Sequence, residues 1–362
     1  MKICYFASGP SFHTKRWCQH FHSLGNEVHL ITFVQVAQEE YPNIHLHIVA
    51  SKKVRVSGGN WHLIKSFRKV RKLVKEISPD IFHALYATSY GVVGAFAGHK
   101  NFIITALGSD LLVSVRSSSI YRMAVRFAFR KAKWITVMSQ EMSDVAKSIG
   151  TDMSKVSIVP FGVDPAIFNA DHRVLSPDEF VVTSTRNLEK IYNIPHLLKA
   201  LHLVKDQIPN LKVNIMGYGS LQEELEALVA ELGLSESVIF WGKVTQYQIA
   251  ETLNKSQVFV SVSLSDGNNI SLNEAMACGA FCIATDIPAN RQWVENKVNG
   301  FLVEIDDVEG LASRISEVYA NYDSLQKKAS PINKAIIQER GTWSNNMKVV
   351  EQKYQEMTRN VR

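Results

Sequence analysis

The sequence predicts an α/β protein that folds as two doubly wound domains in tandem, each built on a parallel sheet. A chain of 362 residues is long enough for two domains of ordinary size. Short β-rich runs alternate with helical patterns along the whole chain, which is the pattern of βαβ units. Hydrophobic residues make up 46% of the chain and charged residues 20%, a composition typical of folded globular proteins.

The first half of the chain shows a regular succession of strand and helix patterns. Strands are expected at residues 2–7, 28–33, 45–49, 81–85, 102–106, 134–138 and 156–159. Helices are expected at residues 13–23, 61–77 and 118–133. A parallel sheet of this kind binds ligands at the carboxyl ends of its strands.

The second half repeats this scheme independently. Its strands are expected at residues 180–184, 213–216, 238–240, 258–262 and 282–284, and its helices at 194–206, 221–232, 246–255 and 271–278. Between the halves, Pro-Phe-Gly-Val-Asp-Pro and a polar stretch occupy residues 160–178. We therefore predict one domain over residues 1–165 and another over 166–339, with their strand ends facing a cleft. The tail from Pro331 onward has a helical pattern that includes Trp343.

Several classes of protein are disfavoured by what the sequence lacks. No apolar run approaches the roughly 18 residues of a membrane span. Residues 1–7 are too short for a signal-peptide core, so we expect them to belong to the fold. The four cysteines form no C-x-x-C pair, which indicates neither zinc nor disulfides and fits a reducing cytoplasm. The absence of Gly-x-Gly-x-x-Gly weighs against a nicotinamide enzyme.

Charge is distributed unevenly along the chain. Residues 1–160 hold 21 Lys and Arg against 9 Asp and Glu, whereas residues 161–362 hold 19 against 25. The first half therefore faces an anionic partner, or else its basic residues are solvated helix surfaces. Arg122, Arg126 and Arg130 recur every four residues and form one basic stripe. Such a helix either docks on anionic lipid or buries its aromatic residues and leaves the arginines in water.

The most informative segment is Ser265-Asp-Gly-Asn-Asn-Ile-Ser-Leu-Asn-Glu-Ala-Met-Ala-Cys-Gly279. A strand is expected to end before it, and a helix to begin near Ser271 after a polar turn. The turn and the helix N-terminus are suited to an anion such as a diphosphate. Asp266 and Glu274 supply acceptors for sugar and ribose hydroxyls. A capped helix with two solvated acids is the alternative.

This segment resembles the E-x(7)-E signature of glycosyltransferase family four, the glycosyl transferases of group one. The resemblance implies a retaining enzyme of the GT-B fold, with two Rossmann-like domains facing a central cleft. It implies that Asp266 binds the donor sugar and Glu274 the ribose. Asp266 stands where the family carries Glu, and Gly267-Asn268-Asn269 replaces the commoner Gly-Phe-Gly. In this fold a terminal helix, here about residues 340–362, joins the first domain.

Other positions match the family in the same order along the chain. Arg186 and Lys190 resemble its donor-phosphate motif, in which a guanidinium grips a diphosphate. Gly217 corresponds to its Gly-x-Gly turn and Gly242 to a turn that faces the nucleotide base. Gly9, after the first strand, would let the backbone approach the donor. With the motif above, the predicted donor-binding residues are Gly9, Arg186, Lys190, Gly217, Gly242, Asp266, Gly267, Asn268, Asn269, Ser271 and Glu274.

The acceptor side is expected in the first domain. The resemblance makes His13 and Arg16 candidates to hold an acceptor phosphate or hydroxyl, although His13 is equally consistent with an exposed residue at a helix start. Leu107 stands where many relatives carry a His that bonds the donor sugar. Asp110 remains a candidate to orient an acceptor hydroxyl. His83 ends a strand nearby, and a satisfied core histidine is the safer interpretation.

The function that follows is a hexosyl or N-acetylhexosaminyl transfer from a nucleotide-diphosphate sugar, with UDP favoured. The acceptor is a glycan or lipid-linked glycan in cell-surface polysaccharide synthesis. We expect Asp266, Arg186 and Asp110 to be catalytic. No cofactor and no metal are expected, because no Asp-x-Asp ends a strand.

The location and the alternatives follow from the same features. The protein is expected in the cytoplasm, either free or peripheral at the inner face of the membrane through its basic first domain, and without nucleic acid. The alternatives are a nucleotide-sugar epimerase of GT-B-like fold and a non-catalytic protein that binds anionic ligands.

Overall fold

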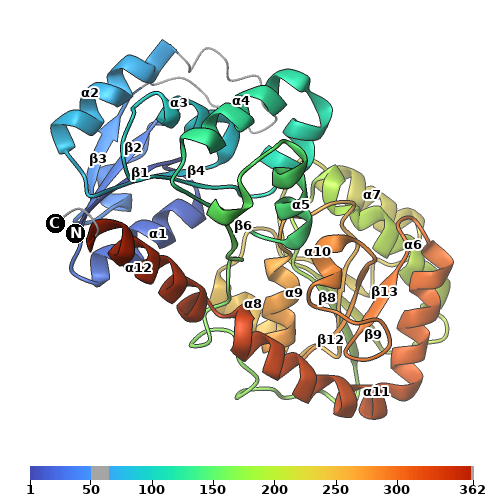
Figure 1. The fold of residues 1–362 in the computed structure, drawn as a ribbon. Coiled ribbons are helices and arrows are strands. Elements are labelled where there is room, and N and C mark those ends of the chain that lie inside the picture. Colours follow the sequence, from blue (N-terminus) through green and yellow to red (C-terminus); the bar gives the residue numbers. More distant parts are fainter. Residues whose placement is uncertain (50–64, 360–362) are drawn as a thin grey trace. The chain divides into compact units, whose positions relative to one another are not determined.

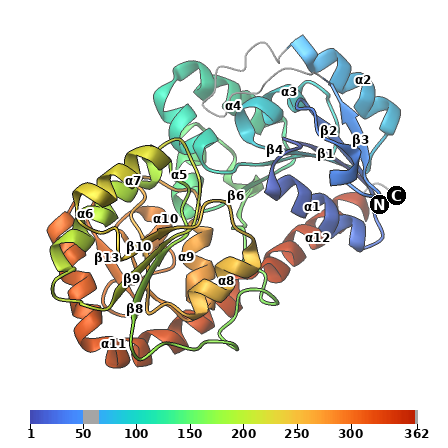
Figure 2. The same cartoon turned by 180° about the vertical axis from the view of Figure 1, so that it is seen from behind.

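The structure is a computed structural model that describes residues 1–49 and 65–359 (Figures 1 and 2). It consists of two compact units, the first formed by Met1–Val159 with Val349–Arg362 and the second by Pro160–Lys348. The chain thus passes to the second unit a few residues before the predicted position at 165. The reason is local: Val163 N–H bonds to Gly341 C=O and Trp343 N–H to Val163 C=O, each at 2.8 Å.

The first unit contains a seven-stranded sheet in which every strand pair is parallel. The order across the sheet is β3-β2-β1-β4-β5-β6-β7. It reverses between β1 and β4, the position at which doubly wound sheets bind ligands. The strands are β1 (Lys2–Phe6), β2 (Glu27–Thr32), β3 (His45–Ile48), β4 (Ile81–Leu85), β5 (Phe102–Thr105), β6 (Trp134–Val137) and β7 (Val156–Ile158).

Helices cover both faces of this sheet (Figures 1 and 2). The helix α1 and the end of α12 lie on one face, and α2, α3 and α4 lie on the other. The first four residues of the predicted helix 61–77 lie outside the described part of the chain. The helices are α1 (Phe12–Ser23), α2 (Phe67–Ile77), α3 (Val92–Ala95), α4 (Ser119–Lys131), α5 (Gln140–Ser148) and α12 (Trp343–Arg359), which belongs to this unit from Val349 onward.

His83 connects the sheet to α12 in the core of the first unit. Its Nδ1 contacts the Tyr354 hydroxyl and its Nε2 lies 2.7 Å from Thr105 Oγ1. Burial lowers the pKa of His83 to about 3, so the ring is neutral and donates from one nitrogen only. The interpretation of His83 as a satisfied core residue is confirmed.

The second unit contains a six-stranded parallel sheet in the order β10-β9-β8-β11-β12-β13. Its order reverses between β8 and β11, so the ligand-binding position of this sheet lies there. The edge strand β13 is not among the predicted strands. The strands are β8 (Phe180–Ser184), β9 (Leu211–Ile215), β10 (Val238–Phe240), β11 (Val258–Ser261), β12 (Phe281–Thr285) and β13 (Phe301–Val303).

The helices of the second unit bury apolar faces against this sheet. Val182, Val213 and Val260 of the strands belong to one core with Leu197 and Leu201 of α6. The helical pattern expected from Pro331 onward is confirmed: Pro331 lies inside α11, and Trp343 begins α12. No helix of the described residues combines the length and apolarity that a membrane span needs. The helices are α6 (Ile194–Val204), α7 (Gln222–Glu231), α8 (Gln246–Asn254), α9 (Ile270–Ala277), α10 (Pro288–Arg291) and α11 (Val308–Ile336).

Candidate active site

Two loops meet where the strand order of the second sheet reverses. Arg186 follows β8 by two residues, and its side chain reaches the loop after β11. Its Nη2 lies 2.6 Å from Asp266 Oδ2. Its Nη1 lies 3.0 Å from Asn269 Oδ1 and 3.4 Å from Ser271 Oγ. Four of the predicted donor-binding residues are therefore in direct contact.

The N-terminus of α9 faces this group of side chains. Asn269 caps the helix, because its Oδ1 accepts from Leu272 N–H at 3.2 Å. The helix therefore begins at Ile270, one residue before the predicted start. The Ile270 N–H bonds to Asn268 C=O at 2.9 Å, whereas the Ser271 N–H has no partner among the bonds of the described residues. The unpaired amide and the helix dipole favour an anion at this position.

Asp266 forms a nearly buried ion pair with Arg186. The side chains of Arg186 and Asp266 are 8% and 15% exposed, so water screens the pair poorly. The other carboxylate oxygen, Oδ1, accepts from Asn268 N–H at 3.1 Å. The carboxylate is thus held by a guanidinium on one side and by its own loop on the other, with Gly267 buried between.

Several polar atoms near the end of β8 are buried with no hydrogen-bond partner among the described residues. They are Ser184 Oγ, Thr185 Oγ1 and Arg186 Nε, together with both amide atoms of Asn273 on α9. Buried polar groups nearly always have a partner, which can be a ligand or water. The concentration of such atoms in three successive residues indicates that this strand end binds something polar.

Three residues that sequence reasoning missed support the cluster. The ring of Tyr192 lies 4.3 Å from the guanidinium carbon of Arg186, a cation–π contact. Asn290 Oδ1 accepts from Asn269 Nδ2 at 2.9 Å, and Trp293 Nε1 donates to Asn268 Oδ1 at 3.1 Å. These residues lie outside the E-x(7)-E segment, so the motif gave no signal for Asn290 or Trp293.

Two glycines after β9 allow the neighbouring loop to approach. A Cβ on Gly217 would lie 2.4 Å from the Arg186 carbonyl oxygen, and one on Gly219 would lie 2.3 Å from that of Leu188. The Leu188 N–H also bonds to Tyr218 C=O at 3.1 Å. Gly217 therefore positions the Arg186 loop through close backbone contact, and its contact with donor stays a prediction.

The remaining predicted donor-binding residues of the second unit are Glu274, Lys190 and Gly242. Glu274 lies one turn into α9 and is 7% exposed. Lys190 is exposed in a single turn of 3₁₀-helix, Lys190–Tyr192. Gly242 follows β10 with φ of +63°, a conformation that favours glycine. Their roles toward a donor stay predictions.

In the first unit, Gly9 lies in the loop after β1. Its N–H donates to Thr32 Oγ1 at 3.0 Å, and a Cβ would lie 2.8 Å from Val36 Cγ1. His13 and Arg16 lie on the first turns of α1. Burial, with a smaller effect of Arg16, lowers the pKa of His13 to about 4. His13 is thus a neutral imidazole rather than an exposed cation, and the acceptor role of both residues stays a prediction.

Asp110 is wholly buried and organises two loops at the carboxyl ends of β4 and β5. Its oxygens accept from Ala87 N–H at 2.7 Å, Gly108 N–H at 2.9 Å, and Leu107 and Leu111 N–H at 3.1 Å. Burial raises the pKa of Asp110, and these four amides offset part of the rise. A carboxylate held in this way positions the backbone. Its predicted contact with the acceptor stays a prediction.

Comparisons with known proteins agree with this arrangement. A model of the "glycosyl transferases group 1" family matches residues 168–336, and a "glycosyl transferase 4-like" model matches residues 2–139. The N-acetyl-alpha-D-glucosaminyl L-malate synthase of Bacillus anthracis is 24% identical, over 80% of this chain and 79% of its own. The UDP-Gal:alpha-D-GlcNAc-diphosphoundecaprenol alpha-1,3-galactosyltransferase of Escherichia coli is 26% identical, over 70% of each chain.

The fold is also that of solved glycosyltransferase-like structures. The Anabaena protein HepE in complex with UDP superposes with a TM-score of 0.80 at 19% identity, over 97% of this chain and 99% of its own. The two family models together match both units, and Arg186, Asp266 and Ser271 meet at the expected strand end. The chain is therefore a member of the group 1 glycosyl transferases, family four, with the GT-B fold.

Proposed function

We propose that this glycosyltransferase moves a hexose or N-acetylhexosamine from a UDP-sugar to a glycan or lipid-linked glycan, with retention of configuration and without a metal ion. The observation that carries the proposal is the position of Arg186 and the α9 N-terminus. Both lie at the carboxyl end of the second sheet, where its strand order reverses. This is where a diphosphate fits a doubly wound domain.

Arg186 and α9 would stabilise the leaving group. As the bond between the anomeric carbon and the diphosphate oxygen breaks, negative charge develops on that oxygen. The guanidinium, the Ser271 N–H and the helix dipole are fixed before the reaction, so they need no reorganisation to meet the charge. Asp266 and Glu274 would accept hydrogen bonds from hydroxyls of the sugar and the ribose.

The transfer step would occur on one face of the sugar. The acceptor hydroxyl forms the new bond to the anomeric carbon on the face that the diphosphate leaves. Its proton passes to the departing phosphate oxygen, so no separate protein base is required. In this scheme Asp266 orients the sugar, Arg186 holds the leaving group, and Asp110 fixes the loops after β4 and β5.

The relatives support the donor and acceptor classes. The Escherichia coli relative is named for UDP-Gal as donor and for an acceptor linked to diphosphoundecaprenol. A Campylobacter jejuni relative, 24% identical over 84% of this chain and 85% of its own, is named for an acceptor of the same lipid class. From these names we infer that the donor of this enzyme is a uridine nucleotide sugar and that its acceptor is a lipid-linked glycan.

A thermal-shift screen of nucleotide sugars tests the donor. A UDP-sugar at 100 times its Kd should stabilise the protein by about 2.7 kcal/mol, which corresponds to roughly 5–10 °C in Tm. EDTA should leave the difference in Tm between ligand-bound and free protein unchanged. A shift that appears only with added Mg²⁺ or Mn²⁺ would contradict metal independence, and a shift with GDP-sugars alone would contradict the uridine donor. Free epimer formed without acceptor would identify an epimerase.

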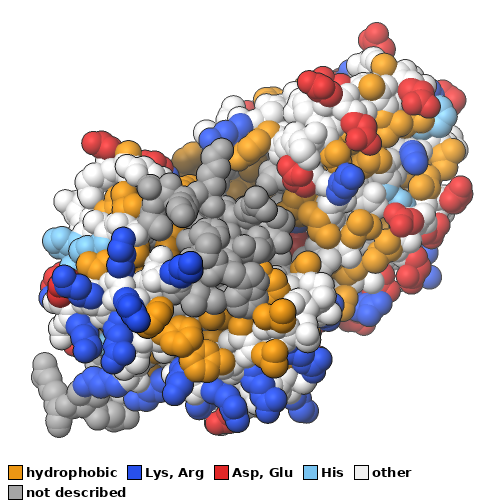
Figure 3. Space-filling view, turned by 90° about the horizontal axis from the view of Figure 1, so that it is seen from above, with side chains coloured by type: hydrophobic (Ala, Val, Ile, Leu, Met, Phe, Trp, Pro, Cys, Tyr) orange, Lys and Arg blue, Asp and Glu red, His pale blue; other side chains and the backbone are white. Residues whose placement is uncertain are grey.

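The first unit has a basic, partly apolar surface suited to an anionic membrane. Phe67 of α2, Phe96 beside α3 and Phe127 of α4 pack in a row. Around this row Ile120 and Met123 are exposed (58% and 64%). Figure 3 shows Lys and Arg side chains crowded on this unit. The exposed basic residues of the two helices are Arg68, Lys69, Arg71, Lys72, Lys75, Arg122, Arg126, Arg130 and Lys131.

The Arg122 stripe is exposed, Phe127 is half-buried and Phe129 is buried, so α4 presents its charges and part of its apolar side chains. We propose that this surface contacts the membrane that carries the acceptor. The triple variant Lys69→Glu, Lys72→Glu, Arg130→Glu should bind phosphatidylglycerol-containing vesicles at least tenfold more weakly in sedimentation assays, since each basic residue contributes about 1 kcal/mol. The control Lys327→Glu, Lys328→Glu on α11 should bind as the wild type does. Equal binding by the triple variant would refute the membrane contact.

A further inference from the structure

A cluster of three histidines and one glutamate lies on one face of the first sheet, on the edge strand β3 and its neighbour β2. Glu27 and His29 are two residues apart on β2, and His45 and His47 are two residues apart on the edge strand β3. The parallel register pairs His29 with His45. Because alternate residues of a strand share a face, all four side chains project from the same side.

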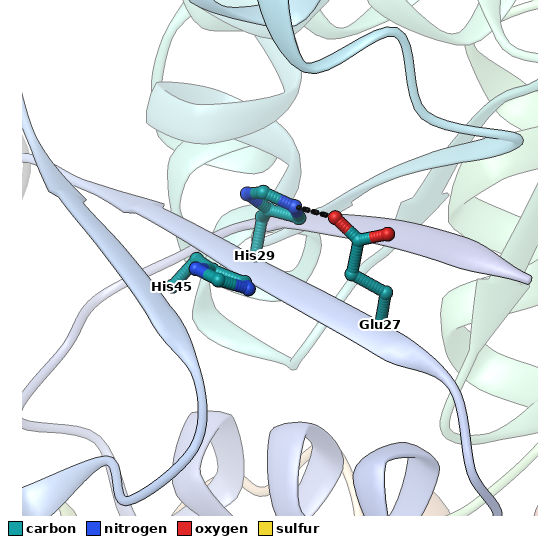
Figure 4. A group of neighbouring side chains, drawn as sticks. All are labelled: Glu27, His29 and His45. Atoms are coloured by element: carbon teal, nitrogen blue, oxygen red, sulfur yellow. Dashed lines mark hydrogen bonds and ion pairs between the residues drawn. The ribbon is translucent and has the colours of Figure 1, made fainter.

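The geometry of Glu27, His29 and His45 fits a metal ion. One ligand atom of each lies within 4.8 Å of the others, and the rings of His29 and His45 are 4.6 Å apart at 22° (Figure 4). Ligands of Zn²⁺ bond at about 2.0–2.2 Å, which places neighbouring ligand atoms roughly 3.3 Å apart. Rotation about side-chain bonds can close this gap, since Glu27 and His45 are exposed.

The hydrogen bonds of His29 are those expected of a histidine that binds a metal ion. Its Nε2 lies 3.0 Å from Glu27 Oε1, and its Nδ1 lies 3.0 Å from His47 Nε2. If Nε2 bound a metal in place of the Glu27 hydrogen bond, the Nδ1–H would donate to His47. A metal-bound histidine usually makes such a bond with its second nitrogen, which fixes the ring and raises its basicity.

One cation competes with a metal ion for this cluster. Lys2 Nζ lies 3.2 Å from Glu27 Oε1, and both side chains are partly exposed. Such an exposed ion pair is weak, so a metal ion can displace it.

We propose that Glu27, His29 and His45 form a Zn²⁺ site that joins the edge strand β3 to β2, with His47 holding His29 in place. Two imidazoles and one carboxylate are a donor set that Zn²⁺ accepts, and water would complete the coordination. The site is separate from the Arg186 cluster and independent of the proposed transfer reaction. Its role would be to secure an edge strand, the part of a sheet most easily displaced.

Isothermal titration of the metal-stripped full-length protein with Zn²⁺ tests the site. We expect one saturable ion per chain, and four-coordinate absorption bands when Co²⁺ replaces Zn²⁺. Glu27→Gln and His45→Gln should each weaken binding at least tenfold, and His47→Gln should weaken it about tenfold through the ring of His29. The control His172→Gln removes an exposed histidine of the second unit and should bind as the wild type does.

Circular dichroism of each variant would verify that the fold is kept. The absence of saturable binding in the wild type would overturn the proposal. So would binding that is equal in Glu27→Gln, His45→Gln and the wild type, because the ion would then be held by scattered surface histidines. Loss of binding in His172→Gln would move the site to the second unit and would equally contradict it.

Discussion

Replacing Arg186 with Ala should lower kcat/KM for the nucleotide sugar by about 10²–10³-fold, the usual effect of removing one charged or hydrogen-bonding group that meets developing charge. The guanidinium is the one side-chain cation that the described structure places in contact with Asn269 and Ser271 at the start of α9. Because it would act mainly on the leaving group, kcat should fall more than KM rises. The measurement is steady-state kinetics with the UDP-sugar that the thermal-shift screen identifies.

The same substitution should also destabilise the second unit. Asp266 is 15% exposed on its side chain, and without Arg186 it would be left nearly buried and unpaired. Breaking a buried pair from one side costs about 3–5 kcal/mol. Urea unfolding measures this cost. Assays at a temperature where the variant remains folded separate the loss of activity from the loss of stability.

Arg291 provides a matched control in the same unit. It pairs with Asp286, but its side chain is 56% exposed and lies away from the α9 contacts. Arg291→Ala should change stability by less than about 1 kcal/mol and leave kcat/KM unchanged. If Arg186→Ala kept both turnover and the UDP-dependent shift in Tm, the cluster at β8 and β11 would not be the donor site.

The two domains and part of the donor site could be predicted from the sequence. Two doubly wound domains followed from alternating patterns, because the period of apolar residues differs between strands and helices. The family resemblance assigned Arg186 and Asp266 to one donor site. The structure gives the reason that they meet: β8 and β11 are neighbours, and parallel strands direct their carboxyl ends to one edge. Asn290 and Trp293 could not be predicted as residues of the site. They reach the site from elements beyond the motif, through side-chain bonds that leave no spacing pattern.

The contacts of Asp110, in contrast, could not be predicted from the sequence. Its place after β5 made it a candidate to touch the acceptor, and sequence holds no signal for whether a carboxylate faces a ligand or its own backbone. The structure shows four amides on its oxygens and no exposed surface. Nearby, Tyr86 has φ of +104°, a strained conformation for a residue with a side chain. Its hydroxyl lies 3.0 Å from Ser109 Oγ, so the loops after β4 and β5 constrain each other.

Replacing Asp110 with Asn should therefore destabilise the first unit by about 3–5 kcal/mol, since hydrogen bonds to a charged acceptor contribute about 1.5–3 kcal/mol each. The Asn side chain has nearly the same shape, but its NH₂ group would face backbone N–H donors from Ala87, Gly108 or Leu107. At least one buried amide would lose its acceptor. Urea unfolding is the measurement, with the exposed Asp144→Asn on α5 as a control expected to change stability by less than about 0.5 kcal/mol.

This substitution also separates two roles for Asp110. If the carboxylate positions the loops, stability and turnover should fall together. The residual activity should then show a higher KM for the acceptor, because the loops after β4 and β5 would no longer be held in place. If the carboxylate contacts the acceptor directly, Asp110→Asn should unfold as the wild type does and yet lose turnover. Because the four amide bonds occupy both oxygens in the folded state, we expect the first outcome.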